Sequence, residues 1–142
     1  MKYFIAEEIG RTFILRMERG DFLKEKITRL CREEKINEAV ISSGIATFDI
    51  VNIQMSNTAG FPMGYNVLNL QEPLELASLD GTIINAEAHI HGVIGNGNRT
   101  WAGHLLEGCR ILYLGEIVIQ ELLGESLIRK ADKDHVFLID KK

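Results

Sequence analysis

The clearest pattern near the N-terminus is an apolar stripe at helical spacing. Gly20-Asp21 precedes the stripe, and this pair ends a strand and offers an aspartate as the N-cap of a helix. Charged residues occupy the other side of the segment as far as Lys35, where the pattern stops. We therefore predict one amphipathic helix between Asp21 and Lys35 that covers one face of a sheet. Its apolar stripe consists of Leu23, Ile27, Leu30 and Cys31.

Most of the remaining chain has the β-branched and apolar composition of strands. Gly44 is interpreted as a bend or bulge, and Asp80-Gly81 as a two-residue hairpin that makes its flanking strands pair antiparallel. One helix with seven or eight strands predicts an α+β fold with a largely antiparallel or mixed sheet packed with one main helix. The predicted strands cover residues 11–17, 39–43, 45–55, 65–70, 74–79, 82–91, 109–123 and 135–139.

Composition and charge narrow the class of protein. A chain of 142 residues with 46% apolar content predicts a single domain over residues 1–142. No leader resembles a signal peptide and no apolar run reaches bilayer length, so we expect a cytoplasmic protein without a membrane partner. Cys31 and Cys109 form no CxxC pair and are interpreted as small buried side chains. The net charge of −4, without a basic block, disfavours nucleic acid as a partner.

Three of the four histidines fall within one short segment. His89 and His91 form an HxH pair in a predicted strand, so both side chains project from one face, roughly 6 to 7 Å apart at their Cβ atoms. The glycine-rich segment 92–99 allows the chain to fold back and bring His104 to the same point. Zinc in catalytic sites commonly takes three protein ligands and keeps one open position. The pattern predicts a divalent metal site, with hydrogen-bonded structural histidines as the alternative, and His135 is assigned a structural role.

Several charged side chains are candidates for work beside such an ion. Glu87 precedes His89 by two positions and shares its face, so it is a candidate acid or base, a fourth ligand or a hydrogen-bond partner of a ligand. Glu75, on the predicted hairpin partner, and Glu107 are alternatives for proton transfer. Arg16 and Arg99 are candidates for binding an anionic small molecule, and surface ion pairs are their alternative.

The order of motifs along the chain resembles the PPC family, the domain shared by plants and prokaryotes. The resemblance covers about residues 10–122 and implies a compact α+β subunit that assembles as a homotrimer, on a fold shared with acetolactate decarboxylase. That enzyme binds zinc through an HxH pair and a later histidine, so the resemblance implies three zinc ligands at the matching positions His89, His91 and His104. The motifs are Arg16, Gly20-Asp21, Ser42, Gly44, Leu74-Glu75-Leu76, Gly81, His89-Ile90-His91, Gly103-His104 and Gly108.

Three functional hypotheses remain open at this point. The first is zinc-assisted chemistry on a small carbonyl or carboxylate compound, either decarboxylation or ester hydrolysis, with a glutamate such as Glu87 or Glu75 moving the proton. The second is a non-catalytic trimeric module for protein interaction. The third is association with DNA. In plants the PPC domain follows AT-hooks with the sequence Arg-Gly-Arg-Pro, and no such segment occurs in this chain.

Overall fold

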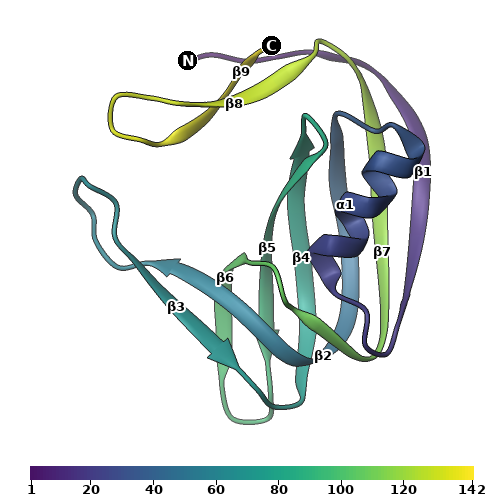
Figure 1. The fold of residues 1–142 in the computed structure, drawn as a ribbon, viewed down its shortest axis with the longest axis vertical. Helices are drawn as coiled ribbons and strands as arrows, with labels where there is room; N and C mark the ends of the chain where they lie inside the picture. Colours follow the sequence, from purple (N-terminus) through teal and green to yellow (C-terminus); the bar gives the residue numbers. More distant parts are fainter.

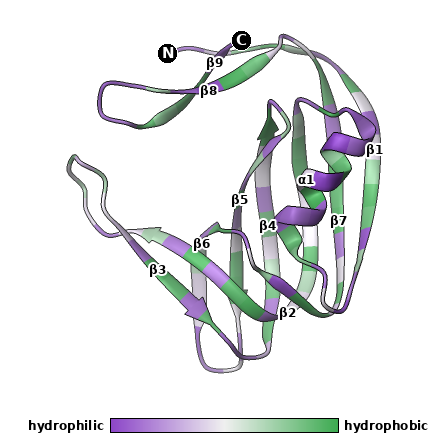
Figure 2. Cartoon of the chain, viewed as in Figure 1, coloured by the Kyte–Doolittle hydropathy of each residue, from purple (hydrophilic) through white to green (hydrophobic).

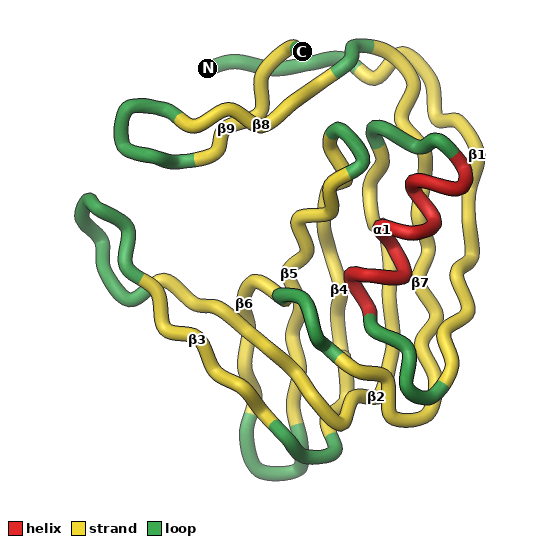
Figure 3. Tube along the Cα trace, viewed as in Figure 1, coloured by secondary structure: helices red, strands yellow, loops and turns green.

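The computed structural model describes residues 1–142 as one helix and nine strands (Figures 1 and 3). Every strand pairing is antiparallel. Seven strands form one sheet, and β8 and β9 form a separate hairpin. The predicted α+β class is confirmed. The sequence pattern missed β6 and β8, and the two strands predicted at 39–43 and 45–55 form the single strand β2. The elements are β1 (Ala6–Glu18), α1 (Leu23–Glu34), β2 (Ala39–Ser56), β3 (Tyr65–Leu70), β4 (Leu74–Ile84), β5 (Glu87–Gly95), β6 (Thr100–Leu105), β7 (Arg110–Gly124), β8 (Leu127–Ala131) and β9 (Phe137–Lys141).

The 18-residue strand β2 serves two sets of neighbours. Its N-terminal half pairs with β4 and β7, and its C-terminal half pairs with β3 and β6. Because β4 also pairs with β5 and β5 with β6, the strands β2, β4, β5 and β6 close a ring. The polar and apolar residues alternate along these strands (Figure 2), as expected when one face meets a core and the other does not.

The core is one cluster of 23 buried apolar residues that joins the inner face of the sheet to the helix. Leu23, Ile27 and Cys31 are buried on α1, which confirms the predicted apolar stripe, and Cys109 is also buried. The predicted helix cap is wrong. Phe22 occupies the N-cap without a side-chain hydrogen bond, because the Asp21 carboxylate turns back and accepts a hydrogen bond from the backbone N–H of Glu18. With 12 residues, this single helix leaves the structure without a helix that could span a bilayer.

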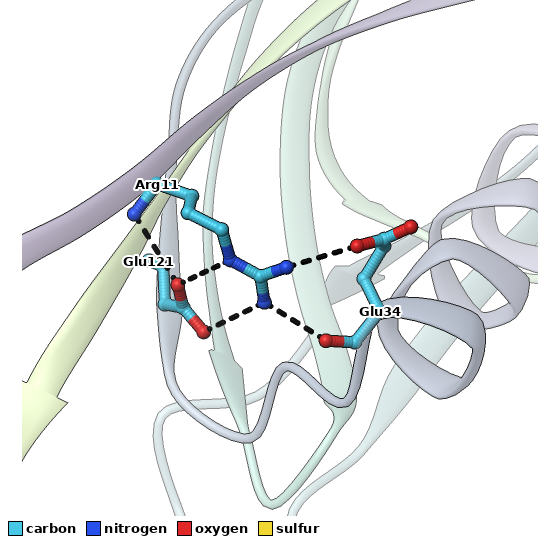
Figure 4. A network of polar contacts seen from close by, with 3 residues as sticks. All are labelled: Arg11, Glu34 and Glu121. Atoms are coloured by element: carbon cyan, nitrogen blue, oxygen red, sulfur yellow. Dashed lines mark hydrogen bonds and ion pairs between the residues drawn. The ribbon is translucent and has the colours of Figure 1, made fainter.

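An arginine ties the open end of the helix to the sheet. Arg11 on β1 donates to both carboxylate oxygens of Glu121 on β7, at 3.0 and 3.2 Å (Figure 4). The same guanidinium donates to the carboxylate of Glu34 at 2.9 Å and to its backbone carbonyl at 2.8 Å. Since carbonyl groups at a helix C-terminus lack partners within the helix, this contact satisfies one of them and fixes the helix against two strands.

The β4–β5 hairpin turns at a different place from the one predicted. Asn85 and Ala86 form the turn, with φ angles of 53° and 62°, as a two-residue turn between twisted strands requires. Gly81 instead lies within β4, where a Cβ atom would come within 2.5 Å of the His89 carbonyl oxygen on β5. The glycine therefore permits a close approach of two strands, which the sequence pattern cannot distinguish from a turn.

The bend or bulge predicted at Gly44 lies instead at a neighbouring position. The strand β2 continues through residue 44, and the nearest register shift against β7 lies between Ile41 and Ser43. A Cβ atom on Gly44 would lie 2.7 Å from the Leu79 side chain and 2.9 Å from that of Ile117. Gly44 leaves room for two core side chains, so its role is packing.

The C-terminal hairpin of β8 and β9 lies near the β4–β5 turn and the N-terminus (Figure 1). The backbone N–H of Leu127 donates to the Glu38 carboxylate, and Lys142 donates to the Asn85 side chain. Lys2 near the N-terminus forms an ion pair with Asp140 on β9 at 2.5 Å. These contacts hold the hairpin over one end of the sheet, beside the start of β5.

We predict that Gly81→Ala lowers the free energy of unfolding by about 2 kcal/mol or more, because the added methyl group must push β5 away from β4. Urea denaturation followed by circular dichroism measures this loss. Gly97→Ala is the matched control, since a Cβ atom there meets nothing within 4 Å. Equal stability of the two variants would contradict the packing role of Gly81.

Candidate metal centre

The three clustered histidines lie on neighbouring strands in fixed register. His104 on β6 pairs directly with His91 on β5, and His91 pairs in turn with Asp80 on β4. His104 also pairs with Gln54 on β2, so one row of four side chains crosses four strands of the ring. Directly paired residues have Cβ atoms roughly 4.5 to 5.5 Å apart, which brings both rings within reach of one small ligand. The predicted return of the chain toward the HxH pair is confirmed.

The third ring comes from the next position on the same face of β5. Ala88 and Ile90 point into the core, so His89 and His91 point away from it. His89 pairs with Thr82 on β4, in the position beside the Asp80–His91 pair. The alternation of the strand thus places two imidazoles outside the core while the residues between them anchor the strand.

The ligand atoms of His89, His91 and His104 all lie within 4.8 Å of one another. The Nε2 atoms of His89 and His91 are 3.1 Å apart, and the ring of His104 meets that of His89 edge-on with centroids 4.5 Å apart. Zn–N bonds of about 2.0 to 2.1 Å at a tetrahedral angle separate two ligand nitrogens by roughly 3.3 Å. The spacing of the histidine nitrogens is therefore close to that required around one ion.

Two of the three imidazoles are held in their neutral form. Burial, followed by repulsion from His89 and His91, lowers the pKa of His104 to about 4. Burial also lowers the pKa of His89, with a further contribution from the positive charge of Arg129. A neutral imidazole keeps the lone pair that a metal ion needs, so these ligands do not have to lose a proton near pH 7.

One nitrogen of the site has no partner within the protein. The Nδ1 atom of His104 is buried and makes no hydrogen bond. A buried polar atom without a partner costs free energy, and such atoms are uncommon unless a ligand or water satisfies them. The unsatisfied nitrogen, the three converging rings and their neutral state all fit a divalent metal ion bound by nitrogen ligands.

The histidine cluster opens on cavities with different linings. One cavity, beside β2 and β6, is lined by Gln54 and Tyr65 together with all three histidines. A second lies over β4, where Asp80 and Thr82 line it with His89 and His91. A third lies between α1, the start of β5 and the C-terminal hairpin, and contains His89 and His104. The site is therefore accessible to a small molecule from more than one side.

The three glutamates predicted as candidates for proton transfer lie in different places relative to the histidines. Glu87 begins β5 and lines the third cavity with His89 and His104, but lies outside the ligand cluster. Glu107 lines the same cavity and forms an ion pair with Lys24 at 2.6 Å, which lowers the pKa of its carboxyl. Glu75 pairs with Gly95 at the other end of β4 and lines a separate cavity. Only Glu87 and Glu107 share a cavity with the histidines.

The arginine at the site is one that the sequence did not suggest. Arg16 forms an exposed ion pair with Glu18, and Arg99 lies in the β5–β6 loop. Arg129 on β8 instead lines the cavity beside His89.

Asp80 is another residue of the site that the sequence pattern did not identify. The misplaced hairpin put it in a turn, and its pairing with His91 reveals its position. His135 lies exposed near the β8–β9 turn, away from the cluster.

Comparison with known proteins identifies relatives over nearly the whole chain. The structure of a metal-containing protein from Archaeoglobus fulgidus matches with a TM-score of 0.84 and 29% identity, over 97% of this chain and 98% of that one. A plant- and prokaryote-conserved (PPC) protein from Pyrococcus horikoshii matches with a TM-score of 0.82 and 31% identity, over 95% of this chain and 94% of that one.

The curated relatives are longer proteins. The bifunctional protein GlmU from a Synechococcus strain is 26% identical over 123 residues, which is 86% of this chain but 19% of that protein. The same protein from a second Synechococcus strain matches over 18% of its length. This chain thus spans about a fifth of the curated relatives that it matches.

The model of the Plants and Prokaryotes Conserved domain matches residues 5–123, which contain the helix, the three clustered histidines and the seven-stranded sheet except its last residue, Gly124. The earlier resemblance is therefore confirmed, and the chain belongs to the Plants and Prokaryotes Conserved domain family.

Proposed function

We propose that this protein binds a divalent metal ion, with zinc as the best candidate, through His89, His91 and His104. The observation that carries the proposal is the convergence of three ligand atoms within 4.8 Å, on paired strands whose register fixes them. The similarity to an archaeal protein described as metal-containing supports it. Three nitrogen ligands without a fourth protein ligand are typical of zinc sites that keep a position for water or substrate.

We further propose that the site acts on a small carbonyl or carboxylate compound, by decarboxylation or ester hydrolysis. A bound divalent ion would supply Lewis-acid polarisation of an oxygen atom. Glu87 is the best candidate for moving a proton, because it is exposed and lines the same cavity as His89 and His104. Glu107 is less suited to this role because its carboxylate is paired with Lys24, and Glu75 because it lies on another cavity.

We propose a homotrimer as the assembled form. The face of the sheet opposite the core carries large apolar side chains on three adjacent strands. Ile14 on β1 is 78% exposed, Ile45 on β2 is 51% exposed and Leu114 on β7 is 48% exposed. An exposed apolar patch of this kind is typical of a surface that contacts another subunit. The same patch supports the alternative of a non-catalytic trimeric interaction module, in which the histidines shape an interface or pocket.

We expect the wild-type protein to retain about one divalent ion per chain after zinc supplementation and removal of free metal. Mass spectrometry of the metal content measures this ratio. His89→Ala/His91→Ala should reduce the bound metal to trace levels because only one ligand remains. His135→Asn is the matched control, since it removes a histidine outside the cluster and asparagine tolerates its φ of 61°. Full metal content in the double variant would reject the site.

The metal-free protein should lose stability as the pH falls from about 6.5 to about 4. In this window His104 is protonated in the unfolded chain. It stays neutral in the folded chain, where the pKa of His104 is about 4. This difference in the pKa of His104 between the two states corresponds to up to roughly 3 kcal/mol in the free energy of unfolding. We expect about 2 kcal/mol because the side chain is partly exposed.

Comparison with His104→Gln isolates this contribution, because the other titrating groups are common to both proteins. In chelator, the free energy of unfolding of the wild type should fall relative to the variant by about 2 kcal/mol between pH 7 and pH 4. Urea denaturation at several pH values measures the difference. A difference that stays constant with pH would show that His104 does not titrate as described.

Ile14→Glu/Ile45→Glu should convert the assembled protein into single chains, because two carboxylates would be buried in the proposed interface. Light scattering should then give the mass of one 16.0 kDa chain, with circular dichroism unchanged. Val67→Glu is the matched control, since this residue is 56% exposed on β3, outside the patch. A monomeric wild type would remove the homotrimer from the proposal.

A further inference from the structure

The C-terminal hairpin brings a positive charge to the histidine site. Arg129 lies on β8, beyond residues 5–123 that match the family domain. It lines a cavity of about 620 Å³ that also contains His89 and His104. A segment outside the family domain therefore completes one wall of the site.

Neutral oxygen atoms hold this guanidinium in place. Its Nη2 atom donates to the hydroxyl of Thr82 at 2.8 Å and to the Thr82 carbonyl at 3.4 Å. Its Nη1 atom donates to the backbone carbonyl of Glu87 at 3.2 Å. Thr82 is the partner of His89 across β4 and β5, and Glu87 begins the histidine strand. The arginine is thus positioned by the same two strands that position the ligand.

No carboxylate forms an ion pair with Arg129. The other charges of the cavity do not replace such a partner, because Lys24 and Glu107 neutralise each other at 2.6 Å and Arg32 adds a further positive charge. Glu87 lines the same cavity, yet its backbone carbonyl, and not its carboxylate, accepts the hydrogen bond from Arg129. Burial lowers the pKa of Arg129, and the nearby charge of Glu87 offsets this shift only in part.

The interaction between the Arg129 guanidinium and a metal ion bound at the neighbouring histidines is repulsive. A guanidinium in the cavity beside His89 repels a divalent metal ion bound by that histidine. The arrangement becomes favourable when a negatively charged group lies between the two and contacts both. A carboxylate is suited to this place, because its planar pair of oxygens matches the fork of guanidinium donors.

We propose that Arg129 is a specificity-determining residue that binds the carboxylate of a small organic acid in the cavity beside His89 and His104. This inference rests on the proposed metal site and narrows its ligands to anionic carboxylic acids. Neutral compounds of the same shape should bind more weakly, because they leave the half-buried guanidinium without an ion-pair partner.

Cobalt-loaded protein tests the proposal, since the visible absorption of Co²⁺ reports both metal binding and the entry of a ligand. The probes are pyruvate and its neutral isostere pyruvamide. We expect the wild type to bind pyruvate at least about tenfold more tightly than pyruvamide, with a preference that declines as salt is added. Arg129→Gln should weaken pyruvate binding about tenfold or more and leave pyruvamide binding unchanged.

The affinity for Co²⁺ itself should move in the opposite direction. Arg129→Gln removes a repulsive charge, so Co²⁺ should bind with equal or severalfold higher affinity, whereas general damage to the site would weaken both metal and pyruvate. Arg129→Lys should retain part of the preference for pyruvate. Lys133→Gln is the matched control, because it removes one positive charge from an exposed position in the β8–β9 turn.

Three results would overturn all or part of the proposal. Equal binding of pyruvate and pyruvamide by the wild type would overturn the proposal without any variant. Unchanged pyruvate affinity in Arg129→Gln would overturn it while leaving the metal site intact. A wild type that binds no Co²⁺ would reject the metal site, and with it the bound acid proposed here.

Discussion

The pairing of β6 with β2 is the constraint on which the candidate site depends. Without it, β4, β5 and β6 would form an open edge, and His104 would have no fixed neighbour on its far side. With it, Gln54, His104, His91 and Asp80 lie in one row across four strands. Because side chains alternate between faces, a slip of one residue in any of these pairings would turn a histidine into the core. The strand register that closes the ring is therefore also the register that places the histidines together.

The charge distribution around this row supports ligand binding in a specific way. The histidines themselves are neutral at pH 7 where burial has lowered their pKa, so an arriving cation displaces few protons. The walls of the cavity beside α1 carry three cations, Lys24, Arg32 and Arg129, and two glutamates, Glu87 and Glu107, of which Glu107 pairs with Lys24. This excess of positive charge beside neutral ligands favours a metal ion that arrives with, or later acquires, a negatively charged companion.

Sequence patterns predicted local features well and long-range ones unevenly. The helical stripe of Leu23, Ile27 and Cys31 predicted the helix because burial on one side is a property of consecutive turns. The return of His104 toward His91 followed from a hairpin within a short segment. The turn at Asn85 was missed, because Gly81 imitates a turn residue when it is needed for the approach of a neighbouring strand. Arg129 could not be assigned to the site from local sequence, since 37 residues separate it from His91 and no pattern links them.

The direct pairing of His91 with His104 also bears on how relatives of this chain can be recognised. The twelve residues between them are four paired positions of the hairpin and the loop at residues 96–99, which joins the two strands. Lengthening or shortening this loop changes the spacing in the sequence while the two imidazoles stay opposite each other. A search that fixes the interval between the HxH pair and the later histidine would consequently miss proteins with the same site. A pattern that instead requires a glycine before the later histidine, where Gly103 lets β6 approach β2, follows the physical requirement more closely.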